Sequence, residues 1–446
     1  MWAFAIEPMP TLAALLAALP REGRFCLDGT AEHREGRFSF AGASPRRVIA
    51  IERGSPAPLV AVGRHLADAG TGATDWAGDD PPPFTPGAAP RDVVAIAYDA
   101  AWSDPRAVSL RTPPRIERGD GPVALLARYD AMVALDLVER RAWAIAEDEA
   151  AARALQRAVL DAIGPPSTAR PTVGDVLVEE PARHLARIER ALEAIAAGDL
   201  YQVNLARPWR VPYVGSPLAL WERMRDASAV PLGLYLELDA RAIVARTMER
   251  FLAWDRAAGR LSTSPIKGTI ARGGADREEA DALLRDDKER AEHSMIVDLM
   301  RNDLSRVAET GSVRVRDALR VEPFARLHHL VSTVECEVRP DADAGAILAA
   351  TFPPGSVTGA PKLRAMELIE TLEDTPRGFY TGALGYADRA GGLSLAVAIR
   401  TAVIERGEAR YFAGGGIVSA SDPARELAET ELKARVFLDA IRALQR

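Results

Sequence analysis

Residues 394–435 read SLAVAIRTAVIERGEARYFAGGGIVSASDPARELAETELKAR, and this stretch decides the fold of the chain. Its first half predicts strands over 394–404 and 409–412, which lead into the triple glycine at 414–416. Glycines let a backbone approach a ligand closely and present N–H groups to an anion. A tight turn is the simpler explanation of three consecutive glycines, so a ligand-binding role needs further support.

The end of this stretch predicts a long helix over residues 423–444, with Asp422 as its N-cap. An apolar stripe at helical spacing consists of Val436, Phe437, Ala440, Ile441 and Leu444. Followed backwards, the same face meets Lys433, Glu429 and Glu426, so it changes from apolar to charged. Buried charges are costly unless they are paired or bind something. The alternative is that this end of the helix emerges into solvent.

A second predicted helix, over residues 276–307, shows the same conflict. Its apolar face contains Met295, Ile296 and Leu299, and Glu292 lies one turn earlier on that face. Glu292 and Glu429 could share one hard divalent cation such as magnesium, which binds few protein oxygens and keeps waters and substrate oxygens. The alternative for Glu292 is an ion pair with Lys288, four residues before it.

The composition of the 446 residues, with 48% hydrophobic and 27% charged, is that of an ordinary globular protein. A formal net charge of -7 argues against a nucleic-acid partner, and an anionic substrate would need a local cluster of cations. Cys26 and Cys336 are too few for a disulfide framework or a zinc site and predict free thiols in a reducing cytoplasm. The apolar run 11–19 is too short to span a membrane, so a buried amphipathic helix and no membrane partner are expected.

The chain is predicted to consist of an N-terminal region, 1–165, and a C-terminal domain, 175–446, separated by a linker that begins at Gly164. Further helices are predicted over 153–163, 181–197 and 360–372, and further strands over 93–98, 131–137, 201–211, 232–238, 242–247 and 381–386. Strands mixed with long helices, without regular βαβ alternation, indicate an α+β architecture with largely antiparallel sheets.

Six strings occur in order along the second half of the chain: SPIKGTIARG (264–273), DKERAEHSMIVDLMRNDLSRV (287–307), HHLVSTV (328–334), FPPGSVTGAPKLRAMELIETLE (352–373), GFYTGALGY (378–386) and GGGIVSASDPARELAETELKAR (414–435). Together they resemble the chorismate-utilising enzyme family over about residues 180–440. The resemblance implies a layered α+β fold of two subdomains around a central cleft, with chorismate bound and converted by the 175–446 domain. It also implies magnesium bound to a carboxylate of the substrate.

The resemblance assigns roles to individual residues. Glu292, Glu429 and the neighbouring Glu426 match the family's metal-binding positions, in agreement with the charged helix faces. Arg400 and Lys433 match the positions that hold the substrate carboxylates. The matches to the substrate-contacting wall are Thr269, Tyr386, Gly414, Gly415 and Gly416.

Two positions distinguish the branches of the family. Where members that add water carry a lysine as base, this sequence has Gln202, which cannot deprotonate water and matches the ammonia-using branch. Members that make anthranilate usually read PIAGT, whereas members that aminate chorismate at C4 usually read PIKGT, as here with Lys267. A neutral Lys267 amine, favoured by nearby Arg400, Lys433 and a divalent cation, could attack C2 and expel the C4 hydroxyl. The alternative is a lysine that only pairs with a substrate carboxylate.

Two further residues complete the predicted catalytic set. The family often reads SPERF where this chain has TMERF at 247–251, and the retained Glu249 matches the general acid that protonates the departing hydroxyl. Its alternative is a surface pair with Arg250. His329 matches an active-site histidine, and its alternative is a structural hydrogen-bonding role.

These features predict formation of 4-amino-4-deoxychorismate from chorismate and ammonia, for p-aminobenzoate and folate synthesis. No glutaminase motif with a nucleophilic cysteine is present in the sequence, so a glutamine amidotransferase partner is expected to supply the ammonia. The alternatives are an anthranilate-forming enzyme of the same family and a non-catalytic chorismate-binding subunit.

Overall fold

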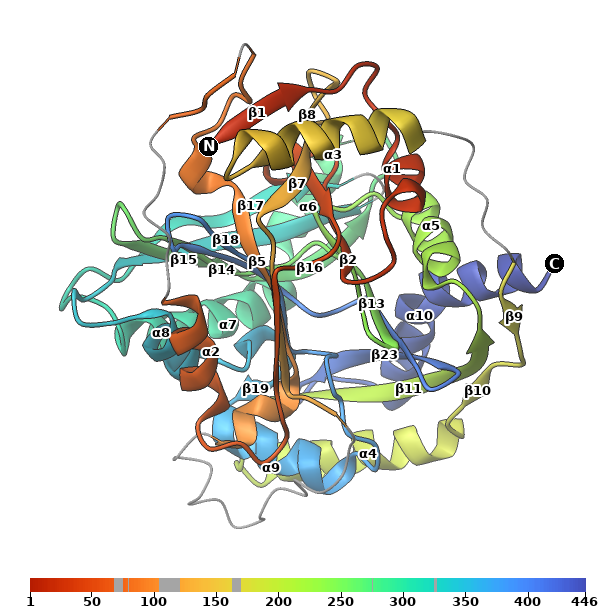
Figure 1. Cartoon of the computed structure of the whole chain (residues 1–446). Helices are drawn as coiled ribbons and strands as arrows, with labels where there is room; N and C mark the ends of the chain where they lie inside the picture. The colour runs from red at the N-terminus through yellow and green to blue at the C-terminus, as the bar shows by residue number, and fades with distance from the viewer. Residues whose placement is uncertain (68–74, 79, 104–120, 163–169, 275, 325–326) are drawn as a thin grey trace.

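The computed structural model describes residues 1–446 except 68–74, 79, 104–120, 163–169, 275 and 325–326. Within the described residues the strands form two large sheets, one of 13 strands and one of 10, in which neighbouring strands run antiparallel. Helices cover the outer sides of these sheets (Figure 1). The layered α+β architecture with largely antiparallel sheets is therefore confirmed.

The larger sheet draws its strands from both halves of the sequence. Its order is β1 (Trp2–Ala5), β8 (Arg141–Ala146), β7 (Ala131–Asp136), β3 (Phe38–Gly42), β2 (Arg24–Asp28), β12 (Leu232–Leu238), β13 (Arg241–Thr247), β22 (Thr401–Glu405), β23 (Glu408–Ile417), β11 (Gln202–Val214) and β10 (Leu177–Val178), with β19 (Gly359–Ala360) and β9 (Thr172–Val173) also paired to β11.

The smaller sheet is also shared between the halves. Its order is β16 (Ile266–Ala271), β18 (Leu327–Glu337), β15 (Arg260–Ser264), β14 (Arg250–Asp255), β21 (Leu393–Val397), β20 (Ala383–Asp388), β5 (Pro90–Ile96), β6 (Ala124–Arg128) and β4 (Arg47–Ile51), and β17 (Arg314–Pro323) pairs with β18. Because β2 pairs with β12 and β5 pairs with β20, the boundary near 165–175 separates two stretches of sequence and not two sheets. The linker residues 163–169 lie outside the described residues.

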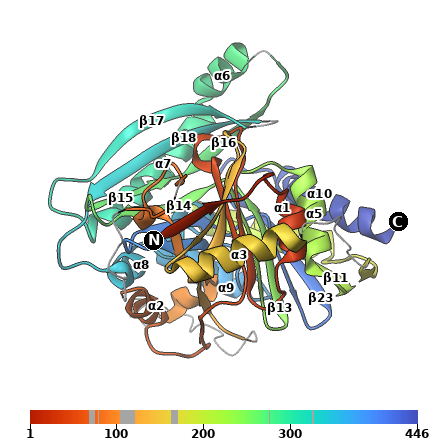
Figure 2. The same ribbon diagram turned by 45° about the horizontal axis from the view of Figure 1, so that its top comes forward.

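The helices form groups on different sides of the sheets. The outer face of the larger sheet is covered by α1 (Leu12–Ala18), α3 (Glu149–Ala162), α5 (Pro217–Ala227) and α10 (Pro423–Gln445), whereas α4 (Pro181–Ala196) and α9 (Lys362–Leu372) pack against β11. On the opposite side from α10, in both views, lie α2 (Pro58–Leu66), α7 (Asp287–Ser305) and α8 (Ala344–Thr351) (Figures 1 and 2). Figure 2 shows α6 (Asp276–Arg285) and the β17–β18 hairpin projecting from the rest of the molecule. No helix in the described part of the chain combines the length and apolar character needed to cross a membrane.

The main hydrophobic core lies between the two sheets. Phe25 and Phe40 from the larger sheet belong to the same buried cluster as Val94, Ile96 and Leu395 from the smaller one. A second cluster fills the space between the larger sheet and its helices. Burial of apolar area on this scale is the main stabilising term for such a fold, and it fixes the two sheets face to face.

Two predicted elements differ from the observed ones. The predicted helix 276–307 is interrupted at Asp286, which separates α6 from α7. The predicted strand 394–404 is two strands, β21 and β22, and Arg400 between them has a positive φ of 51°. The side chain of Lys288, the alternative partner of Glu292, lies outside the described residues. The break at Arg400 lets the chain cross from the smaller sheet to the larger one.

Candidate active site

The triple glycine lies inside a strand and not in the turn that three glycines alone would favour. Residues 414–416 belong to β23 and pair with residues 204–206 of β11. A Cβ on Gly415 would lie 2.9 Å from Oε2 of Glu426 and 4.0 Å from Oε1 of Glu429. Two carboxylates of α10 therefore lie over this strand, and glycine leaves room for them.

Side chains from both sheets meet at Gly416 of the same strand. A Cβ on Gly416 would lie 3.4 Å from Nζ of Lys267, and the amide nitrogen of Gln202 is closer still. Lys267 comes from β16 of the smaller sheet, whereas Gln202 begins β11 of the larger sheet. The lysine and the amide that distinguished branches of the family in the sequence thus meet at one glycine.

Lys267 lies within a set of charged side chains that bears directly on its protonation. Burial and the neighbouring ammonium of Lys433 lower the pKa of Lys267. The carboxylates of Glu249, Glu292 and Glu429 act in the opposite direction and do not outweigh these effects. A lowered pKa enlarges the neutral fraction of the amine, which is the form that acts as a nucleophile.

Glu249 is buried in the turn between β13 and β14, where it is only 6% exposed. Burial raises the pKa of Glu249, although hydrogen bonds from the Ser356 hydroxyl and the Ile266 N–H and the charge of Lys267 partly oppose the rise. The backbone N–H of Glu249 donates to the hydroxyl of Thr247 at 3.3 Å. Thr247, which stands where the family often has serine, therefore helps to hold the turn. A carboxyl group with a raised pKa is suited to donate a proton near neutral pH.

Two buried amides on β11 have side-chain atoms with no hydrogen-bond partner. Both amide atoms of the fully buried Gln202 lack partners, and so does Oδ1 of Asn204, which is 6% exposed. Oδ1 of Asn204 and the hydroxyl of Tyr380 each lie 3.0 Å from the place of a Cβ on Gly414. Buried polar groups are nearly always hydrogen-bonded, so this wall has unfilled capacity to bind a polar ligand.

Asn204 and Tyr380 did not emerge from the sequence reasoning. One signal was available for Asn204: alternate residues of a strand face the same side, so a strand that presents Gln202 also presents Asn204. Tyr380 stacks on Phe412 with a ring-centroid distance of 5.4 Å, which fixes its ring beside β23. No local pattern distinguishes Tyr380 from Tyr386 in the string that carries both.

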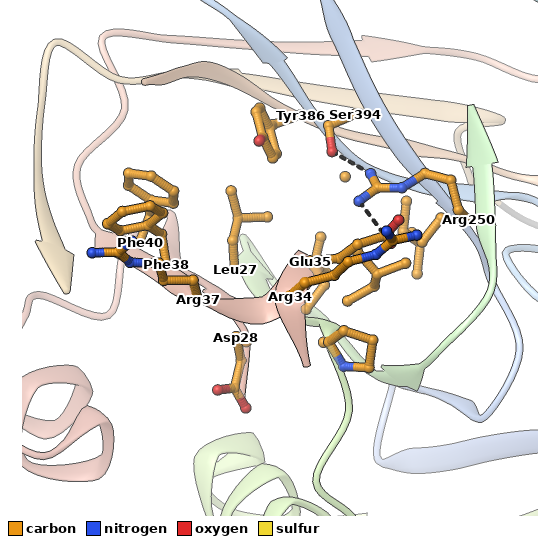
Figure 3. A pocket seen from close by; sticks show the side chains of 18 of the residues that line it. Leu27, Asp28, Arg34, Glu35, Arg37, Phe38, Phe40, Arg250, Tyr386 and Ser394 are labelled. Atoms are coloured by element: carbon orange, nitrogen blue, oxygen red, sulfur yellow. Dashed lines mark hydrogen bonds and ion pairs between the residues drawn. The ribbon is translucent and has the colours of Figure 1, made fainter. Parts of the chain in front are cut away.

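The structure corrects the prediction for Tyr386. Its side chain lines a separate pocket between the sheets, together with Phe40, Arg250 and Ser394 (Figure 3). None of the other predicted site residues lines this pocket. Arg250 bonds there to Ser394 and to Glu35, which leaves no support for a surface pair between Arg250 and Glu249. Tyr380, and not Tyr386, is the tyrosine at the triple glycine.

His329 is buried on β18, next to the strand that carries Lys267. Its Nδ1 lies 3.2 Å from the carbonyl oxygen of Gly268. Burial, with a contribution from Arg400, lowers the pKa of His329 to about 4, so the imidazole is neutral at neutral pH. The backbone of Thr269 pairs with His329, whereas the side chain of Thr269 lies outside the described residues. His329 therefore helps to fix the backbone that follows Lys267, and its catalytic role remains a prediction.

The carboxylates predicted to bind magnesium are partly or fully exposed, and two of them, Glu426 and Glu429, lie over Gly415. The side chain of Glu429 is 47% exposed and lies 2.6 Å from Nζ of Lys433, and Glu426 accepts a 2.7 Å hydrogen bond from Ser421. The carboxylates of Glu426 and Glu429 thus face the glycine strand from partly exposed positions at the start of α10. Among the described residues, the ligand atoms of Glu292, Glu426 and Glu429 do not converge within 4.8 Å. An oxygen-only set that is left open fits magnesium, which keeps waters and substrate oxygens.

Lysine, glutamate and amide side chains from both sheets thus meet a glycine strand bordered by acidic residues. A family model described as chorismate binding enzyme matches residues 78–439. The chain therefore belongs to the chorismate binding enzyme family.

Its relatives carry two kinds of name. The chain is 39% identical to the aminodeoxychorismate synthase of Streptomyces griseus, over 72% of this chain and 47% of that protein. It is 42% identical to anthranilate synthase component 1 of Aquifex aeolicus, over 57% of this chain and 52% of that protein. The chain spans about half the length of these curated relatives. The crystal structure of anthranilate synthase component I from Streptococcus pneumoniae TIGR4 is 26% identical, covers 92% of both chains and has a TM-score of 0.73.

Proposed function

We propose that this chain converts chorismate and ammonia to 4-amino-4-deoxychorismate, as the synthase subunit that works with a glutaminase. The observation that carries the proposal is the position of Lys267, whose amine lies beside Gln202 at Gly416 with a lowered pKa. The name of the Streptomyces griseus relative supports the same activity.

The proposed reaction has two substitutions across the conjugated ring. The neutral amine of Lys267 forms a bond to C2, the double bonds shift, and the C4 hydroxyl leaves as water with a proton from Glu249. Ammonia then bonds to C4, the double bonds shift back, and the C2–nitrogen bond to Lys267 breaks. Glu249 recovers a proton from the entering ammonia, so the enzyme returns to its starting state. Arg400 and Lys433 would hold the two carboxylates of the substrate.

Formation of anthranilate is the competing activity, because two of the three relatives described above are named for it. In that reaction ammonia itself attacks C2, and a lysine at the same place would obstruct the attack. Lys267 would occupy the path of that attack, so its presence favours amination at C4. Purified protein with chorismate, magnesium and an ammonium salt tests the choice directly, because the two products differ in mass. Anthranilate as the main product would overturn the proposal.

The source of ammonia gives a prediction. Because the chain contains no glutaminase motif, we expect turnover with ammonium salts and no appreciable turnover with glutamine until a glutaminase subunit is added. The word component in the names of two relatives supports a partner of this kind. Chorismate consumption with each nitrogen source measures this. Efficient use of glutamine by the purified chain alone would contradict it.

Magnesium dependence gives a second prediction. Bound magnesium would neutralise charge on a carboxylate of chorismate, and Glu292 and Glu429 would hold it. Glu292→Gln and Glu429→Gln are each expected to raise the magnesium concentration needed for half-maximal activity by at least about tenfold. Isothermal titration of magnesium provides a readout that does not depend on turnover. Glu431→Gln, two residues beyond Glu429 and exposed on α10, is the control, and unchanged magnesium affinity in both site variants would refute the assignment.

A further inference from the structure

The strand that carries the unpaired amides is held by a buried ion pair outside the predicted site. Arg377 is 3% exposed and Glu373 is 8% exposed. Two short bonds join them, from Nε to Oε2 at 2.8 Å and from Nη2 to Oε1 at 2.6 Å. Burial opposes a charge on Arg377, yet Glu373 raises its pKa above the usual value, so the guanidinium stays charged. A buried pair of this kind contributes little net stability. Its other contacts therefore indicate its role better than its own energy does.

The remaining donors of Arg377 go to backbone and side chains that border the site. Nη2 donates to the carbonyl oxygen of Asn204 at 2.7 Å. Nη1 donates to the carbonyl oxygen of Val357 at 3.1 Å and to the hydroxyl of Thr381 at 3.2 Å. All five N–H groups of the guanidinium are thereby used, which a lysine could not reproduce.

Each of these contacts lies next to a residue of the candidate active site. Asn204 carries an unpaired amide oxygen at Gly414. Val357 follows Ser356, whose hydroxyl bonds to Glu249. The guanidinium carbon also lies 5.9 Å from the ring centroid of Tyr380, within cation–π range. The carboxylate of Glu373 extends the arrangement, because it accepts a 2.8 Å bond from the N–H of Ala206, which pairs with Gly414.

We propose that the Arg377–Glu373 pair is a positioning device for the chorismate site. It fixes the amide-bearing part of β11, the segment at Ser356 that supports Glu249, and the ring of Tyr380 relative to one another. The pair itself touches none of the proposed reacting groups, so it acts through the residues that it holds. This inference rests on the proposed chorismate chemistry and is independent of which amine product is formed.

The structure offers a matched control. Arg24 and Glu237 form another buried pair, joined at 2.7 Å, and Arg24 lies 5.8 Å from the ring centroid of Tyr235. Arg24 also donates to the carbonyl oxygen of Leu16 at 2.7 Å. This is likewise a buried Arg–Glu pair, with further bonds to Glu237 from Arg21 and from the hydroxyl of Tyr235. Its contacts connect α1, β2 and β12 and reach none of the site residues.

The test compares Arg377→Lys and Glu373→Gln with Arg24→Lys and Glu237→Gln. Thermal unfolding establishes a temperature at which every variant is folded, and chorismate consumption is measured there with varied ammonium. We expect all four variants to lose stability, but only the first two to lose kcat, by about 10- to 100-fold, with a raised KM for ammonium. The KM for chorismate should change less, because Arg400 and Lys433 are untouched. Thr381→Val, which removes a single acceptor of Arg377, should lower kcat by a smaller factor and covers the case in which the other variants do not fold.

Wild-type kcat per folded molecule in Arg377→Lys and Glu373→Gln, or equal losses in the Arg24 and Glu237 variants, would overturn the proposal. An Arg377 variant that loses thermal stability but keeps the wild-type kcat and KM for ammonium would also overturn the proposal. Failure of the proposed function shows separately, as a different product from the wild-type protein, and leaves this comparison of rates intact.

Discussion

Lys267→Ala is expected to reduce formation of 4-amino-4-deoxychorismate by about 10³-fold or more, because it removes the proposed covalent nucleophile. Ammonia could then reach C2 in the space that the side chain leaves beside Gly416, and the remaining product should shift to the 2-amino isomer or anthranilate. Separation of the products by chromatography with mass detection measures both effects. A variant that still makes 4-amino-4-deoxychorismate at a near-normal rate would rule out the nucleophilic role.

The same proposal predicts a covalent adduct. With chorismate present and ammonia withheld, the C2–nitrogen bond should persist, and the intact chain should gain the mass of chorismate less one water. Lys267→Ala should show no adduct, and Lys362→Met serves as a control for labelling of a buried lysine, because Lys362 is paired with Asp303 at 2.6 Å. A lysine that only pairs with a substrate carboxylate predicts something different: weaker chorismate binding, an unchanged product and no adduct.

The final helix shows what sequence alone can establish. Asp422 caps α10 by accepting a bond from the N–H of Arg425, and Phe437, Ala440 and Ile441 of the predicted stripe are buried. Capping and amphipathic periodicity are local properties, so they can be read from a sequence. The exposure of Glu429 is not local, because it depends on how α10 packs across β23.

The triple glycine shows the opposite case. Three glycines are poor strand formers and are typical of a turn. Only tertiary pairing with β11, and the approach of Lys267 and Glu426 to the backbone, explain why they form part of β23. The match to the family motifs gathered these residues into one predicted site, but their strand conformation could not be derived from the glycines themselves.

The sequence also could not show which of the two tyrosines, Tyr380 or Tyr386, lies at the triple glycine. Tyr380 precedes β20, whereas Tyr386 lies within it, and the two side chains face different spaces. Their separation in sequence gives no indication of which one faces β23, since that depends on how the smaller sheet packs on the larger. The break of the predicted strand 394–404 at Arg400 could not be read from the sequence for the same reason. Residues on both sides of the break are apolar, so the sequence pattern alone does not show that the chain passes from one sheet to the other.

Glu249→Gln is expected to lower kcat by about 10²- to 10⁴-fold, the usual contribution of a general acid. Glutamine keeps the size of the side chain and can accept bonds from Ser356 and Ile266, but it cannot donate a carboxylic proton. Glu405→Gln is the control, because Glu405 pairs with Arg241 at the start of β13, whereas Glu249 follows the end of β13. A loss of less than about threefold in Glu249→Gln would contradict the assignment, on the same scale.

The pH profile separates this acid role from a binding role. The active form needs Glu249 protonated and Lys267 neutral, so the wild-type rate at constant free ammonia should be bell-shaped. The pKa of Glu249 is raised and the pKa of Lys267 is lowered, which brings the two requirements closer together in pH. In Glu249→Gln only the requirement for a neutral lysine remains, and the residual rate should rise with pH to a plateau without an alkaline decline. If Glu249 served only in binding, the variant would keep the bell shape at a lower rate, and the alkaline decline would need another group to explain it.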